Sequence, residues 1–140
     1  MKKRIINALI CMCMVVAAFS VNVFASNGSG HVQVPKSGYQ VLAVKDITRT
    51  KAYSYAKVKA DSVTPVTPYG SDTFTKCKAR LFNSNNTLKA ITDWYTLTEG
   101  KDYTKLYIYE GSLSQSKFDL HFKGNNSNYA AEIYFSYKGL

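Results

Sequence analysis

The chain has 140 residues and carries eighteen basic against nine acidic side chains, a net charge of +9. This length suits one domain with a core of its own, and the positive charge favours anionic partners. Three cysteines, two histidines and scattered carboxylates form no recognisable zinc spacing and no Asp-x-Asp-x-Asp-Gly calcium loop, so we expect no metal and no cofactor.

Residues 1–25 have the pattern of a cleaved secretory signal. Residues 2–4 are basic, Ile5 to Phe19 is almost wholly apolar, and a small-residue site ends at Ala25. A single membrane anchor is the alternative, but the apolar run is short of the ~20 residues that a span needs. We therefore expect cleavage after Ala25 and secretion.

Cleavage would change both the charge and the cysteine count. The net charge would fall from +9 to +6 because the three basic residues at 2–4 leave with the signal. Cys77 would be the one cysteine remaining, so no intramolecular disulfide could form. An exported domain without disulfides behind a short basic leader is typical of bacteria, and of Gram-positive bacteria in particular.

The next segment, residues 26–38 (SNGSGHVQVPKSG), is rich in Gly and Ser. This composition predicts a flexible leader onto the domain, in which Val32 and Val34 could form a short edge strand.

Residues 39–140 show repeated alternation of apolar and polar side chains, which is typical of half-buried β-strands. The last example is the clearest, with Ala131, Ile133 and Phe135 on one face. Matching segments predict about seven strands, at 39–45, 51–60, 73–82, 87–97, 103–110, 117–123 and 129–137. Residues 61–72 contain two of the prolines and are expected to form a loop between two sheets.

The segment at 87–97 has an alternative structure, and the last two strands have a predicted register. Residues 87–97 could form a helix, but the Asn-rich turn before them favours a returning strand. The last two strands are expected to form a hairpin with Phe122 opposite Ala131, which places His121 opposite Glu132 and leaves Asp119 and His121 outside.

Short strands, polar turns and the lack of a clear helix predict a single small antiparallel β-sandwich over residues 39–140. A closed β-barrel is the alternative.

The common catalytic motifs are absent from the sequence. His31 lies in the predicted leader, and His121 has no identifiable Ser or Cys nucleophile. Cys77 falls on the core side of its strand, as a buried hydrophobe would. Asp119 and Glu132 offer a pair of carboxylates of the glycosidase type. We expect no catalytic residues and a non-enzymatic protein.

Two strand faces are basic and aromatic. One carries Lys51, Tyr53, Tyr55, Lys57 and Lys59, and the other carries Lys76, Lys78 and Arg80. If the two strands were neighbours in one sheet, six cations would lie close together, and a bound polyanion would relieve their repulsion. The alternative is that these lysines keep the surface solvated and block edge-to-edge pairing.

A second aromatic patch is expected from Tyr103, Tyr107 and Tyr109, which share one face of their strand. Such rings can stack on sugars or contact a protein partner, and they can also cover a sheet.

The part after the signal is rich in Tyr and Asn, with Asn-x-x-x-Tyr from Asn125 to Tyr129 leading into the last strand. In this pattern the chain resembles small signal-peptide-bearing all-β proteins of Gram-positive bacteria. The resemblance implies export and an all-β fold, and it transfers no site residue.

The expected function is that of a secreted, non-enzymatic β-domain. Its partner would be a cell-wall polyanion, a glycan, an anionic membrane surface or another protein; nucleic acid is not expected in this compartment. The alternative is a secreted antimicrobial or toxin-like cationic protein.

Overall fold

The computed structural model describes residues 26–36, 38–50, 53–66, 75–125 and 129–139. The predicted signal at 1–25, Lys51 and much of the predicted loop at 61–72 lie outside these residues. Within them, nine strands and one short 3₁₀ helix follow one another: β1 (Asn27–Val34), β2 (Val41–Thr48), β3 (Tyr55–Pro65), β4 (Lys76–Asn83), β5 (Asn86–Ala90), β6 (Tyr95–Thr98), β7 (Thr104–Tyr107), η1 (Glu110–Ser112), β8 (Lys117–Gly124) and β9 (Ala131–Lys138).

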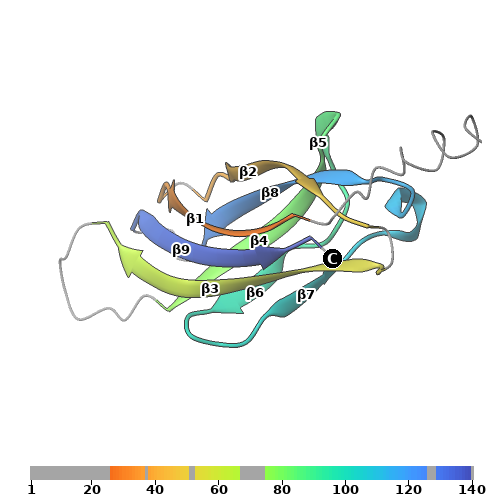
Figure 1. Ribbon diagram of the computed structural model, residues 1–140. Helices are drawn as coiled ribbons and strands as arrows, with labels where there is room; N and C mark the ends of the chain where they lie inside the picture. The colour runs from red at the N-terminus through yellow and green to blue at the C-terminus, as the bar shows by residue number, and fades with distance from the viewer. Residues whose placement is uncertain (1–25, 37, 51–52, 67–74, 126–128, 140) are drawn as a thin grey trace, which may run out of the picture.

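The strands form two antiparallel sheets. Sheet A has the order β1-β9-β3-β7, and sheet B has the order β2-β8-β4-β5, with β6 also paired to β4. Figure 1 shows the two layers, with β3 and β9 in front of β4 and β8. The predicted β-sandwich is confirmed, and the sheets do not close into the alternative barrel.

The core lies between the sheets and is built from the alternating positions that the sequence predicted to face inward. Each side chain on these positions is at most 1% exposed, which removes its apolar surface from water. The inward sets are Ala56, Val58 and Ala60 on β3, Cys77, Ala79 and Leu81 on β4, Phe118, Leu120 and Phe122 on β8, and Ala131, Ile133 and Phe135 on β9.

Residues 87–97 extend as predicted and do not form a helix, but they make two short strands. β5 pairs with the end of β4, and β6 pairs with its beginning. Between them, the Ile91 N–H donates to the Leu81 carbonyl at 2.9 Å, and the Ile91 side chain is fully buried.

Part of the predicted loop at 61–72 belongs to a strand. β3 continues past a bulge between Ala60 and Ser62 and ends at Pro65, opposite Ala131 of β9. Val63 is fully buried in this extension. A proline is compatible with this position because it stands at the end of the strand.

The prediction of a flexible leader at 26–38 is wrong for most of its length. Residues 27–34 form β1, which pairs with β9 over eight residues. Gly28 and Gly30 lie directly opposite Tyr137 and Phe135, and the rings of these two aromatic residues occupy the space above the glycines. The glycines therefore make room for aromatic side chains, and they do not mark flexibility here.

The predicted hairpin of the last two strands is also wrong. β8 lies in sheet B between β2 and β4, and β9 lies in sheet A between β1 and β3. Phe122 does not pair with Ala131; its ring packs against that of Phe135 across the core, with centroids 4.7 Å apart. Both edges of each strand are already paired, so the connection crosses between the sheets.

We expect Gly30→Ala to lower the free energy of unfolding by about 1–3 kcal/mol, the usual cost of overpacking a core. A Cβ at this position would lie 2.6 Å from Cζ of the buried Phe135 ring. Gly111→Ala is the control, because a Cβ there meets no atom within 4 Å. Urea unfolding of both variants measures the difference, and equal stability would contradict the packing role of Gly30.

Candidate functional site

The two basic strand faces lie on opposite sides of the molecule. β3 belongs to sheet A and β4 belongs to sheet B, so the outer faces of these strands point away from each other. The single patch of six cations that neighbouring strands would have made is therefore not formed. Each face instead acquires cations from other strands.

On sheet A, three lysines stand side by side across three strands. Lys57 of β3 pairs directly with Lys105 of β7 on one side and with Lys138 of β9 on the other. We call these three residues the lysine row. Among the described residues, no carboxylate lies within 4.0 Å of any of their Nζ atoms. Lys105 and Lys138 were not among the predicted site residues, since only strand pairing brings them to Lys57.

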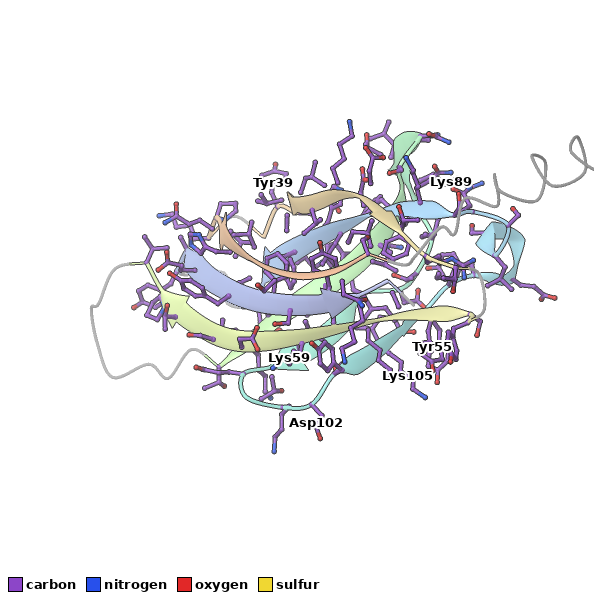
Figure 2. The ribbon with its side chains drawn as sticks, viewed as in Figure 1. Tyr39, Tyr55, Lys59, Lys89, Asp102 and Lys105 are labelled. Atoms are coloured by element: carbon purple, nitrogen blue, oxygen red, sulfur yellow. The ribbon has the colours of Figure 1, made fainter. Side chains whose placement is uncertain are left out.

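Tyrosine rings support the lysine row. Lys105 Nζ lies 4.7 Å and Lys57 Nζ 6.0 Å from the centre of the Tyr55 ring. Lys138 Nζ lies 4.7 Å from the centre of the Tyr103 ring. Figure 2 shows Tyr55 and Lys105 together on the β3–β7 side of the molecule. These cation–π contacts hold the ammonium groups in place and leave their charge unneutralised.

Lys59 differs from the lysine row although it shares the face. Its Nζ lies 2.8 Å from Asp61 Oδ1, and this hydrogen bond raises the pKa of Lys59. Its charge is therefore neutralised locally. Lys59 faces the Tyr103 ring at 5.5 Å, so the ring is shared with the lysine row.

The three tyrosines of the predicted second patch have different surroundings. The Tyr103 ring lies beneath Lys59 and Lys138. Tyr107 packs edge-on against Tyr55, with ring centroids 5.6 Å apart. Tyr53 extends this cluster, at 5.5 Å from Tyr55. Tyr109 instead donates its hydroxyl to Asp93 at 2.8 Å, away from the lysine row.

On sheet B, the predicted cations Lys78 and Arg80 lie beside two residues that the sequence analysis missed, Lys123 and Trp94. Lys123 of β8 pairs directly with Lys78 of β4. Trp94, the sole tryptophan of the chain, lies under Lys123 Nζ at 4.3 Å and under Arg80 Cζ at 5.6 Å. We call Lys78, Arg80, Trp94 and Lys123 the tryptophan cluster. Lys76 is exposed at the start of β4.

The histidine and carboxylate expectations need correction. His31 is held on β1, 2.7 Å from Glu132 and stacked on Tyr134, and does not lie in a flexible leader. Asp119 and Glu132 lie in different sheets and do not form a pair.

Asp119 and His121 are buried, at 0% and 7% exposure, and not outside as predicted. His121 packs against Phe82 with ring centroids 4.4 Å apart. Asp119 Oδ1 accepts from the Asp46 N–H at 2.9 Å and lies 2.8 Å from Ser84 Oγ. Asp46 reaches Asp119 from β2, within the second of two register shifts in the pairing of β2 with β8, between Val44 and Ile47.

The remaining surface offers little for chemistry. Among the described residues, no three Asp, Glu, His or Cys side chains gather as metal ligands. A hollow of about 280 Å³ is lined by Asn85, Ser114, Gln115, Ser116 and Lys117, a set without an acid–base pair. Within the same residues, no helix has the length and hydropathy to cross a membrane.

Comparison with protein-family models, curated proteins and solved structures finds no match to this chain.

We expect Cys77 to be unreactive toward thiol reagents in the folded protein. The side chain is fully buried, and burial raises the pKa of its thiol to about 12, so the reactive thiolate is scarce at neutral pH. Labelling by iodoacetamide, followed by mass spectrometry, should require denaturant. Rapid labelling without denaturant would contradict the buried position.

We expect His121 to make stability fall in mild acid. Burial lowers its pKa below the ordinary value of 6.5, although Asp119 opposes the shift. The unfolded chain therefore binds the proton more tightly, so the contribution of His121 is present above pH 6.5 and lost as the pH falls through the folded pKa. His121→Phe keeps a ring against Phe82 and should flatten this part of the unfolding profile; an unchanged slope would contradict the prediction.

Proposed function

We propose that this protein is an exported, non-enzymatic β-sandwich that binds an anionic polymer of the cell envelope through the lysine row on sheet A. The single observation that carries the proposal is the direct pairing of Lys57 with Lys105 and Lys138, with no carboxylate of the described residues within 4.0 Å of their Nζ atoms. The pattern of residues 1–25 supports export, as argued from their basic start and apolar run.

The lysine row favours an anion because the strand register places its three positive charges side by side. Like charges directly opposite each other in a sheet are destabilising, at the scale of ~0.2–1 kcal/mol for a cross-strand pair. Neighbouring strands are about 4.8 Å apart, so the three lysines span roughly 10 Å in a line. A chain with repeated negative charges complements this line better than a single small anion does.

The tyrosines favour a polymer that also carries sugar or polyol units. Tyr53 and Tyr107 are 49% and 51% exposed and lie next to the lysine row through Tyr55. Exposed rings beside cations offer apolar faces for stacking as well as hydroxyls for hydrogen bonds. Phosphate- and sugar-bearing wall polymers combine both chemistries.

The test is retention of the purified protein on cell walls with their phosphate polymers and on the same walls after acid removal of the polymers. We expect Lys57→Gln/Lys105→Gln/Lys138→Gln to weaken retention by about tenfold, since exposed ion pairs contribute ~0.2–1 kcal/mol each. By analogy with single-stranded nucleic acids, three contacts should give a loss of roughly hundredfold per tenfold rise in salt.

The matched control is Lys45→Gln/Lys89→Gln/Lys117→Gln, which removes three exposed lysines from other positions and changes the net charge equally. Its retention should match that of the unmodified protein. The variant in the lysine row should unfold at about the same temperature as the unmodified protein, because it removes opposed like charges together with cation–π contacts of similar size. Equal retention of both variants would refute the proposal, and killing of related cells without retention would favour the toxin-like alternative.

A further inference from the structure

The tryptophan cluster on sheet B repeats the chemistry of the lysine row with different residues. Lys123 lies over the face of Trp94, and the Arg80 guanidinium lies over the same ring. Arg80 Nε donates to the Thr92 carbonyl at 2.7 Å, which fixes the guanidinium beside the ring. The cluster is therefore organised before any ligand arrives.

The cluster also concentrates positive charge. Lys78 and Lys123 are directly opposed across β4 and β8, and Arg80 follows two residues later on β4. Among the described residues, no carboxylate lies within 4.0 Å of these cations. Burial lowers the pKa of Lys123, and the charges of Lys78 and Arg80 lower it further. A bound anion would relieve this repulsion.

We infer that the tryptophan cluster is a second site for the same phosphate-bearing polymer, so that one molecule can bridge two polymer strands. The inference rests on the proposed function for the ligand class, and on the sandwich for the geometry. The outer faces of sheets A and B point in opposite directions, and the sheets of a sandwich pack about 10 Å apart.

The placement of the two sites favours a polymer over a membrane surface. A flat bilayer can contact one outer face of the sandwich at a time, which leaves the other cationic face unoccupied. Flexible polymer strands can reach both faces together. Where both strands belong to one wall, binding of the second strand becomes effectively intramolecular, which raises the overall affinity.

Trp94 provides a direct probe of the second site, because its emission is the sole tryptophan signal of the chain. Titration with purified linear poly(glycerol phosphate) should change this emission in the unmodified protein. The same change should appear in Lys57→Gln/Lys105→Gln/Lys138→Gln, which alters sheet A alone. It should be lost in Lys78→Gln/Lys123→Gln and kept in the control Lys45→Gln/Lys117→Gln.

Bridging is measured separately by light scattering. In the unmodified protein, scattering should rise with added polymer and fall again in excess polymer, because each strand then carries too few protein molecules to extend a network. Both site variants should lose this peak, and the control should keep it. Thermal unfolding of each variant verifies that the sandwich is intact.

The outcomes separate the two proposals. Unchanged Trp94 emission while the lysine row retains the polymer overturns the second site and leaves the proposed function standing. A scattering peak that persists in Lys78→Gln/Lys123→Gln also overturns it. An emission change with no effect of the variant in the lysine row on retention overturns the proposed function alone. Tighter binding to anionic lipid vesicles than to the polymer overturns the assigned ligand.

Discussion

The contact between Phe122 and Phe135 is the interaction on which the rest of the sandwich depends. Each ring belongs to an interior strand of its own sheet, and each is at most 1% exposed. Burial of a phenylalanine contributes about 1.5–3 kcal/mol. Phe135 also fills the space over Gly30, which brings β1 onto the edge of sheet A. With Cys77 free and buried, apolar packing of this kind holds the two sheets together.

A buried cation secures one end of this packing through bonds to backbone carbonyls. Arg49 is 2% exposed and donates to the backbone carbonyls of Tyr53, Leu113 and Gln115. These bonds connect the segment after β2 to Tyr53, just before β3, and to the loop before β8. Buried polar groups need such partners, and here three carbonyls from two irregular segments of backbone provide them. Tyr53 lies two residues before Tyr55, whose ring faces the lysine row.

The core and the surface are two results of the same alternation. Once Val58 and Ala56 face inward on β3, Lys57 must face outward, and the register with β7 and β9 then sets its neighbours. Cation–π contacts at exposed sites contribute ~0.5–1 kcal/mol, close to the cost of opposed like charges. The tyrosines thus offset the repulsion within the sheet without cancelling the positive field outside it. On the outer face of sheet B, Trp94 lies against Lys123 and Arg80 in the same way.

Period-two patterning in the sequence determined which segments extend between β2 and β9, apart from the end of β3, and which of their side chains face inward, because successive side chains of a strand point to opposite sides. It identified Leu81, Leu120 and Ile133 as core, and Lys57 and Lys78 as surface. It misread Gly28 and Gly30, because the rings that cover them come from a strand more than a hundred residues away.

Only the tertiary structure decided which strands are neighbours. β8 and β9 follow each other in the chain, which suggested a hairpin. In the structure β8 pairs with β2 and β4 in sheet B, and β9 pairs with β1 and β3 in sheet A. The division of the strands between two sheets separated Lys57 from Lys78. It brought Lys105 next to Lys57, and it brought Lys123, with Trp94 beneath it, next to Lys78. Local alternation determines which side chains of a strand face the core. Strand pairing depends on contacts between residues far apart in the chain, and no local pattern contains these contacts.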